Sequence, residues 1–563
     1  MFIRKTRNSA GQTYLHLVES YRINGKVRQR TLLSLGRMEE GKLDELAQAI
    51  ARHQNLLSAL DVAKNISVDA TYILGPLLVL RGLFDKLGID EALERIERKH
   101  PKLELPFRDI VFALVAARLV RPSSKLAVYE QMLEQFYPDL RADNIDLHHV
   151  FRALDVLTAG KDDLETSLFV HGRDLFSRHV DVVLYDLTTL RFESTKETES
   201  LRRFGFSKEK RNDCTQVVLG LLVDPEGIPL GFEVYPGNTV EGKTLVDIVH
   251  KIREKYRVRR FIFVADRGLL SKANLESIRS VDGEFIVGMR IGNLAKKRPE
   301  LYDRSLFHEV DDGLEIFETN FEQDRGIVTW SRERAARDEK LRTDIVDKLR
   351  TKLDGRKKVS AKTFVSNANY RYFLKGLDKG QTPVIDEAKV AEAAKKDGFF
   401  AIVTNVHHKS GTELFAQYKQ LWHVEDVFGE LKGTLKARPV FHWKDERIVG
   451  HLTMCFIALL CEAHIIRALR REGDAYKGRA VREKLLSSRQ LSAVTVLREL
   501  AEVRAIPVVI GDERYWVRTD IRGHVAILFQ RLRLCIPPRL LKRESVVAQG
   551  DRTPVSCENC SDL

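Results

Sequence analysis

Asp186, Asp266 and Glu425 are the residues of this 563-residue chain whose types and positions best suit a chemical reaction. Each aspartate follows an apolar run typical of a buried strand, and Glu425 lies in a segment with helical spacing of apolar side chains. Carboxylates with ordinary pKa values near ~4 repel one another when three converge at neutral pH. Mg²⁺ prefers carboxylate oxygens and relieves that repulsion. Two such ions about 4 Å apart can catalyse in-line phosphoryl transfer on nucleic acid.

Each acid also has a purely structural interpretation. A strand-end aspartate often caps the turn that follows it, and a helical glutamate often pairs with a surface lysine. Three nearby acids compete for the same role: Asp181, Asp426 and Glu430. Asp181 lies towards the beginning of its strand, and Asp426 points about 100° away from Glu425 on a helix. We therefore prefer Asp186 and Glu425.

The segment around Glu425 is predicted to form one amphipathic helix. Its apolar stripe consists of Leu414, Leu421, Phe428, Leu431 and Leu435. Tyr418, Glu425 and Lys432 are spaced by seven residues, which returns each to within about 20° of the last, so they project from one side along this stripe. A carboxylate facing the interior requires a partner or a metal.

The aspartates belong to a chain region that is rich in predicted strands. Three antiparallel strands come first, followed by parallel strands that alternate with helices, which is the order of an RNase H-like α/β fold. Active sites of open α/β sheets lie at the carboxyl ends of strands, where we expect both aspartates. The predicted elements are strands 180–185, 216–223, 229–235, 260–265 and 284–289, and helices 243–256 and 272–281.

The fold class is therefore α/β, with an RNase H-like catalytic core interrupted by an insertion domain. The insertion should contain strands at 314–318, 327–330 and 370–374 around a charged helix at 331–353. The predicted divisions are an N-terminal β-hairpin and helix (1–60), a helical domain suited to DNA-end binding (61–178), the first part of the core (179–292), the insertion (293–398), the second part of the core with the third acid (399–475) and a basic C-terminal region (476–563).

Composition narrows the class of protein and its partner. Lys plus Arg exceed Asp plus Glu by 93 − 80 = 13, which favours a polyanionic partner, nucleic acid first. No apolar run of signal-peptide length follows Met1, and the longest, 452–461, is about half a bilayer span. We expect a cytoplasmic protein without a membrane segment and with reduced cysteines. The lone Cys557-Glu558-Asn559-Cys560 lacks the second pair of a zinc site.

Several motifs together carry a resemblance to a known family. They are Tyr185-Asp186-Leu187-Thr188-Thr189, Val264-Ala265-Asp266-Arg267-Gly268-Leu269, the trio Tyr418, Glu425 and Lys432, and also Gly205-Phe206-Ser207-Lys208, Pro236-Gly237-Asn238, Arg438-Pro439-Val440-Phe441-His442 and the stretch 14–36. The chain resembles the DDE transposases of bacterial insertion sequences up to about residue 470. Within them it is similar to the insertion-sequence-4-like class, which has a Tyr-Arg-Glu-Lys signature.

The resemblance implies a role for each site residue. Asp186, Asp266 and Glu425 would bind two Mg²⁺ ions, with Mn²⁺ as a substitute, and Tyr418 and Lys432 would contact DNA phosphate near the cleaved end. The position of the signature arginine is occupied by Leu421, and Lys419 or His423 could replace it. Relatives carry an insertion tryptophan that stacks on a flipped base, and Trp330 is the tryptophan of this insertion, although a core role suits it too.

A basic loop follows the first aspartate. It contains Arg202, Arg203, Lys208 and Lys210, which either contact backbone phosphate or form a solvated charged run.

The implied function is transposition of DNA. The protein would bind the terminal inverted repeats of its own element, cleave strands there, and join the 3′-OH ends to target DNA. We expect a homodimer on paired ends of double-stranded DNA, associated with the nucleoid of a bacterium or archaeon. Two alternatives are an RNase H-like nuclease that cuts without joining and an inactive, sequence-specific DNA-binding repressor. The presence of all three acids argues against the repressor.

Overall fold

A computed structural model describes residues 2–23, 26–37, 71–136, 145–176, 182–198, 200–207, 211, 213–256, 261–292, 298–353, 368–375, 383–469, 493–510 and 513–542. The chain divides into two compact units. The smaller unit comprises Met1–Thr71, Ile506–Val517 and Arg539–Arg552, and the larger comprises Tyr72–Ala505, Arg518–Pro538 and Thr553–Leu563.

The smaller unit begins with an antiparallel sheet of β1 (Phe2–Arg7), β2 (Thr13–Ile23) and β3 (Lys26–Arg37). Ile23 pairs with Lys26, so the strands have the register that a two-residue Asn-Gly turn requires, although the turn itself lies outside the described residues. Also outside them are the helix predicted at 41–60 and the Cys557–Cys560 motif. In the same unit, residues 515–517 of β17 (Glu513–Arg518) pair with β18 (Leu540–Lys542).

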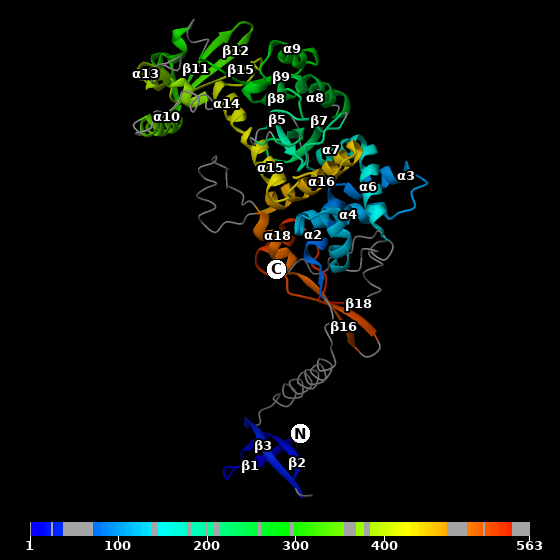
Figure 1. Ribbon diagram of the computed structural model, residues 1–563. Helices are drawn as coiled ribbons and strands as arrows, with labels where there is room; N and C mark the ends of the chain where they lie inside the picture. Colours follow the sequence, from blue (N-terminus) through cyan, green and yellow to red (C-terminus); the bar gives the residue numbers. More distant parts are fainter. Residues whose placement is uncertain are drawn as a thin grey trace. The chain divides into compact units, whose positions relative to one another are not determined.

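The larger unit contains a helical part organised around one apolar helix. This helix, α16 (Asp445–Leu469), packs against α4 (Phe107–Val120) and α6 (Leu147–Ala159), as Figure 1 shows in yellow against blue and cyan. By length and composition α16 could cross a membrane, but 72% of its most apolar window is buried inside the protein, which is typical of a central core helix. The helical part also includes α2 (Gly75–Lys86), α3 (Ile89–Arg98), α7 (Lys161–Phe176), α18 (Ala493–Ala501) and α19 (Gly523–Arg531).

A nine-stranded sheet forms the rest of this unit, with strand order β10-β11-β12-β15-β9-β8-β5-β6-β7. Antiparallel pairing joins β5, β6 and β7, and parallel pairing joins β5 to β8 and β8 to β9. The predicted RNase H-like fold class is therefore confirmed. The core strands are β5 (Val182–Arg191), β6 (Gln216–Val223), β7 (Pro229–Pro236), β8 (Ile262–Ala265) and β9 (Glu284–Met289).

Helices cover both faces of these core strands. On one face, α8 (Glu241–Tyr256) and α9 (Lys272–Ser280) bury their apolar side chains against Tyr185 and Leu187 of β5 and Phe285 and Val287 of β9. On the other face, α14 (Gly411–Lys419) contacts β8 and β9, and α15 (Trp422–Lys432) contacts β5 and β6. Because side chains alternate along a strand, Asp186 faces the α15 side.

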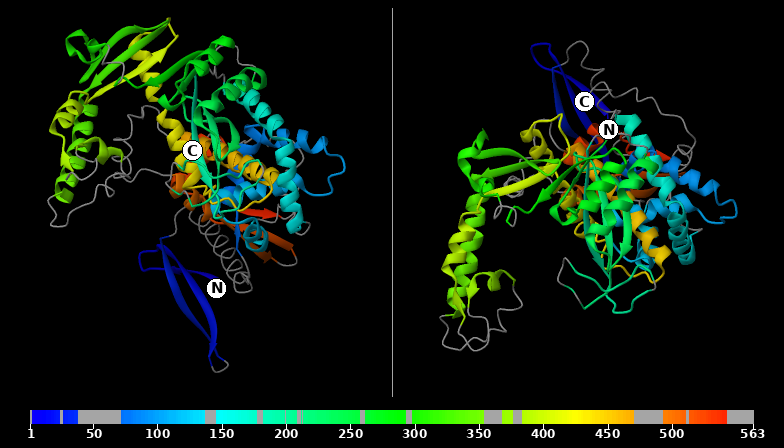
Figure 2. Two further views of the ribbon diagram at one scale, coloured as in Figure 1. Left: turned by 45° about the horizontal axis from the view of Figure 1, so that its top comes forward. Right: turned by 90° about the horizontal axis from the view of Figure 1, so that it is seen from above.

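The insertion extends the same sheet. β10 (His308–Asp311), β11 (Leu314–Phe321) and β12 (Asp324–Ser331) join the core through β15 (Phe399–Thr404), which pairs with both β12 and β9. The charged helix is α10 (Arg332–Leu353), close to its predicted bounds. Both views of Figure 2 place α10 to one side of the core strands.

One predicted strand of the insertion is wrong. Residues 370–374 were expected to form a strand, but the chain there forms a short helix, α12 (Ala368–Tyr372), and then β13 (Leu374–Lys375), which pairs only with β14 (Val384–Ile385). Leu349 of α10, Phe373 and Leu374 form a small separate core, packed against side chains of α13 (Glu387–Ala394). This local packing overrides the strand propensity of the aromatic residues.

Candidate active site

Asp186 lies in the middle of β5, and the prediction that its strand ends there is wrong. β5 pairs with β8 as far as Tyr185 and Ala265, and then continues alongside β6 to Arg191, whose carbonyl accepts a hydrogen bond from the Val440 amide. The edge of β5 beyond Tyr185 is therefore open where β8 ends, which gives Asp186 access to solvent without ending its strand. The backbone amide of Leu187 donates a 2.7 Å hydrogen bond to Asp186 Oδ1 and orients the carboxylate.

Asp266 follows β8 directly and precedes the short turn η4 (Arg267–Leu269). The parallel register of Tyr185 with Ala265 places Asp266 level with Asp186 on the neighbouring strand. Tyr418 Oη donates a 3.3 Å hydrogen bond to Asp266 Oδ1. Burial, reinforced by the negative charge of Asp266, raises the pKa of Tyr418, so its hydroxyl stays protonated as the donor at neutral pH.

The third acid lies on α15, and the single helix predicted here is in fact two. α14 ends at Lys419 and α15 begins at Trp422, so Tyr418 and Glu425 belong to different helices. Val424, Phe428 and Leu431 are buried, whereas the Glu425 side chain is exposed rather than facing the interior. Within the described part of the chain, Glu425 has neither a hydrogen bond nor an ion pair.

One open pocket of about 540 Å³ brings the three acids together. Its charged lining consists of Asp186, Asp266, Glu425, Arg267, Arg290 and Lys432. The acids come from β5, the end of β8 and α15, which is the convergence that the sequence predicted. Carboxylate oxygens around an open, polar pocket suit a hard divalent cation, and DDE domains generally use one. The identity of the ion stays a prediction.

Two other groups of side chains among the described residues have possible metal-ligand atoms within 4.8 Å of one another. One is Asp162, Glu165 and Glu233, whose oxygens already pair with the ammonium groups of Lys161 and Lys255. The other is the trio Asp146, His148 and His149 at the start of α6, of which His149 is half-buried. Neither lines the pocket of the three acids.

Neither residue expected to replace the signature arginine lines the acidic pocket. Lys419 is exposed, and its ammonium lies 4.8 Å from the ring centroid of Phe415. His423 is only 8% exposed, and its ring stacks 3.6 Å from that of Trp422. Lys432 does line the pocket, from the last turn of α15.

The basic loop divides into buried and exposed residues. Arg202 is only 1% exposed, with its guanidinium 4.5 Å from the ring of Phe192 and 4.4 Å from that of Trp443. DNA has no access to this side chain, so its predicted phosphate contact is corrected to a packing role. Arg203 is half-buried and pairs with Glu197 at 3.7 Å. Lys208 and Lys210 lie outside the described residues.

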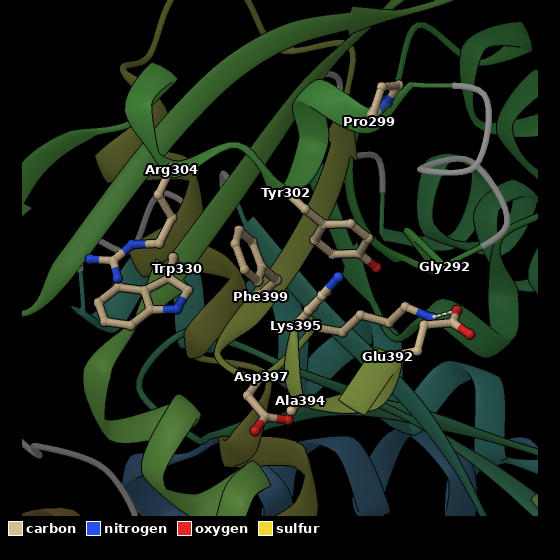
Figure 3. Close-up of a pocket in the computed structure, with 11 residues that line it drawn as sticks. Gly292, Pro299, Tyr302, Arg304, Trp330, Glu392, Ala394, Lys395, Asp397 and Phe399 are labelled. Atoms are coloured by element: carbon tan, nitrogen blue, oxygen red, sulfur yellow. Dashed lines mark hydrogen bonds and ion pairs between the residues drawn. The ribbon is translucent and has the colours of Figure 1, made fainter. Parts of the chain in front are cut away.

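Trp330 lines a different pocket, of about 600 Å³, in the insertion (Figure 3). Tyr302 and Phe399 contribute further rings, and the Arg304 guanidinium covers the Trp330 ring at 3.5 Å from its centroid. Arg304 is itself held by an ion pair with Glu315. Base stacking by Trp330 stays a prediction, and on the face that Arg304 covers it would require Arg304 to move.

Sequence reasoning missed Arg290, which lines the acidic pocket immediately after β9. The available signal was the one used for Asp266, namely a charged residue directly after a predicted buried strand.

Comparison with known protein families agrees with this geometry. The model of the transposase DDE domain matches residues 179–461, a range that contains all three acids and the insertion between the second and third. The model of the IS1634 family transposase N-terminal domain matches residues 3–61, which precede the helical part. A search of curated proteins finds no match to the chain.

The two matches account for the N-terminal sheet and for the interrupted RNase H-like core in their observed order. They support an insertion-sequence transposase, an enzyme that acts on DNA. They do not show that the chain belongs to the insertion-sequence-4-like class. Since the DDE match spans half of the chain and includes the acidic pocket, the protein belongs to the family of transposases with a DDE domain.

Proposed function

We propose that this transposase binds the terminal inverted repeats of its own element, cleaves DNA strands at the element ends, and joins the freed 3′-OH ends to target DNA. The observation that carries the proposal is the pocket lined by Asp186, Asp266 and Glu425, contributed by three separate elements of an RNase H-like core. An insertion-sequence-4-like mechanism fits the presence of Tyr418 and Lys432 on the helices beside this pocket.

In this proposal the three carboxylates hold Mg²⁺. Two bound ions would activate the attacking oxygen and stabilise the leaving oxygen of a phosphodiester. The protein groups do the positioning: the Leu187 amide and the Tyr418 hydroxyl each fix one oxygen of an aspartate, and Lys432 contributes a positive charge for DNA phosphate. The formal charge of +13 would assist approach to DNA.

We further propose a homodimer that pairs two element ends in the cytoplasm of a bacterium or archaeon, associated with the nucleoid. Joining both ends to one target requires that they be held together, and a symmetric dimer is the commonest way to do so.

The test uses a labelled duplex that carries the element end. Wild-type protein with Mg²⁺ is expected to cleave at the element boundary, whereas Glu425→Gln should cleave at least about 100-fold more slowly because it loses a charged metal ligand. EDTA should abolish cleavage and leave binding of the end intact. The matched control is Glu276→Gln, an exposed glutamate on α9 that is not part of the pocket and should cleave like the wild type.

Other outcomes discriminate among the alternatives. End binding without cleavage by either protein would favour the inactive repressor. Cleavage that does not depend on the terminal repeat, with no joined product when target DNA is added, would favour a nuclease.

A further inference from the structure

The acidic pocket is lined by more basic side chains than the DNA contacts predicted from the sequence. Besides Lys432, two arginines line it, and both are exposed. Within the described part of the chain, neither Arg267 nor Arg290 forms an ion pair or a side-chain hydrogen bond. Two arginines of the same unit that do not line this pocket are paired, since Arg279 pairs with Asp324 and Arg325 pairs with Glu318.

The sheet explains why these two arginines share a wall. β8 and β9 are parallel neighbours, so Arg267 and Arg290 both follow strand ends at the same edge of the sheet. The two segments touch: a Cβ on Gly288 would lie 3.2 Å from the Arg267 amide nitrogen. Phe285, Val287 and Met289 face the α8 and α9 layer. By alternation, Arg290 projects with Gly288 towards α14 and α15, as Asp186 does.

An anionic ligand explains why two exposed arginines line the pocket without an ion pair among the described residues. A phosphodiester is repelled by three carboxylates, so its approach requires positive charge in the same pocket. The guanidinium group presents a planar fork of N–H donors that binds two phosphate oxygens at once, unlike the point charge of a lysine. Exposed and uncommitted arginines can bind such a ligand without first breaking an ion pair.

We propose that Arg267 and Arg290 together form a binding site for a DNA backbone phosphate on the wall of the acidic pocket. This assignment rests on the proposed function, and it names two residues that hold the strand for the chemistry of the three acids. Arg290 supplies the guanidinium that Lys419 and His423, which lie outside the pocket, do not.

The test combines protein variants with single neutral phosphates in the DNA. Element-end duplexes carry one methylphosphonate at each position near the cleaved bond, and the proteins are wild type, Arg267→Ala, Arg290→Ala and Arg290→Lys. The control Lys272→Ala removes an exposed cation of α9 that does not line the pocket. Binding is measured in the Glu425→Gln background over a range of salt concentrations, and cleavage is measured in single turnovers.

We expect Arg290→Ala to cleave about 10- to 100-fold more slowly and to lower the salt slope of binding by about one, the value for one lost phosphate contact. One methylphosphonate should slow the wild type by a similar factor and have no further effect on Arg290→Ala or Arg267→Ala. Arg290→Lys should recover part of the lost rate. Lys272→Ala should keep the wild-type sensitivity to every methylphosphonate.

Two results would overturn the arginine site. If the arginine variants respond to every methylphosphonate as the wild type does, they contact no phosphate, and the proposed function survives without them. If wild-type protein binds no element end at any salt concentration, the proposed function and the phosphate site both fail. Matching thermal unfolding of Arg290→Ala and wild type establishes that the variant is folded.

Discussion

Tyr418, a residue of the signature, donates a hydrogen bond directly to the pocket acid Asp266. The resemblance predicted that Tyr418 contacts DNA phosphate, yet here its hydroxyl donates to Asp266 Oδ1. The centroid of the Tyr418 ring lies 5.1 Å from that of Phe400. The guanidinium of Arg334, from the insertion, lies 4.7 Å from the centroid of the same Phe400 ring. The tyrosine therefore fixes an acid whose strand has already ended.

We predict that Tyr418→Phe, which removes only the hydroxyl, slows single-turnover cleavage about 10-fold. A hydrogen bond to a charged group contributes about 1.5–3 kcal/mol, and its loss leaves the Asp266 carboxylate free to rotate. Cleavage should be titrated with Mg²⁺, and the variant should need more of it. The control is Tyr370→Phe in the insertion, outside the acidic pocket. An unchanged Mg²⁺ requirement would mean that the hydroxyl does not position Asp266.

At the scale of single elements, β9 approaches α14 closely at one glycine. A Cβ on Gly288 would lie 2.5 Å from Tyr418 Oη, nearer than atoms pack. We predict that Gly288→Ala displaces Tyr418, lowers the free energy of unfolding by about 1–3 kcal/mol as overpacking does, and slows cleavage.

The matched control for this glycine lies on α15. A Cβ on Gly429 of α15 would meet nothing within 4 Å, so Gly429→Ala should be neutral or stabilise the protein by up to about 1 kcal/mol through helix propensity. Urea unfolding of both variants is the measurement. Equal stability of Gly288→Ala and wild type would contradict the close packing of Tyr418 against β9.

Packing of α15 on α16 involves a buried carboxyl group. Glu462 of α16 is 1% exposed, and neither of its oxygens has a hydrogen-bond partner among the described residues. Two ionised carboxylates cannot hydrogen-bond each other, but a protonated Glu462 can donate to Glu430 of α15. Burial, and then the nearby Glu430, raise the pKa of Glu462 well above its usual value.

A raised acid pKa in the folded state makes stability depend on pH in a defined direction. The folded protein holds this proton more tightly than the unfolded chain, so the stabilisation is complete below the ordinary pKa of 4.5 and is lost as the pH rises towards the folded value. We predict that Glu462→Gln, which cannot ionise, gains stability over wild type as the pH rises above 4.5, by up to about 1.4 kcal/mol per pH unit.

Urea unfolding midpoints at several pH values test this prediction. Glu446→Gln, an exposed glutamate of the same helix, should show no such trend. A constant difference between Glu462→Gln and wild type at all pH values would show that Glu462 does not titrate in this range.

An element could be predicted when residues close together in the sequence determine it, and not when contacts between residues far apart in the sequence do. The continuous apolar runs predicted β5 to β9, because local sequence determines buried strands. The break between α14 and α15 could not be predicted, because the apolar stripe passes through Leu421 without a Gly or Pro. Both interpretations of Arg202, as a phosphate contact or a solvated residue, required an exposed side chain, because only the tertiary fold brings Phe192 and Trp443 to its guanidinium.

For the site, the three acids could be found from the sequence because each belongs to a recognisable motif. Their partners could not, since the bond from Tyr418 to Asp266 spans 152 residues and the position of Arg290 depends on the pairing of β8 with β9.

At the scale of the whole larger unit, a buried ionic network joins the helical part to the catalytic core. Glu165 of α7 is fully buried, accepts from the Phe232 amide of β7 at 3.1 Å and from Lys161 at 3.2 Å, and pairs with Lys255 of α8. Burial alone would lower the pKa of Lys161, but Glu165 and Glu233 more than offset this and raise it.

We predict that Glu165→Ala lowers the free energy of unfolding by about 3–5 kcal/mol, because it leaves the Lys161 ammonium buried without its main partner. Asp163 lies on α7 as well and forms an exposed ion pair with Lys99. We expect Asp163→Ala, which breaks this pair, to change the free energy of unfolding by less than about 1 kcal/mol. Urea unfolding of both variants provides the comparison. Similar losses in the two would mean that the network does not hold α7 to the core.

The insertion between β9 and β15 also has a consequence for the time course of synthesis. Glu425 follows Asp266 by 425 − 266 = 159 residues, so at about 5–20 residues per second the ribosome adds the last acid roughly 10–30 s after the second. Until residues 399–404 emerge, β9 lacks the strand that pairs with its outer edge. The N-terminal sheet is therefore synthesised well before the third acid of the pocket, and the nascent protein has an open sheet edge in between.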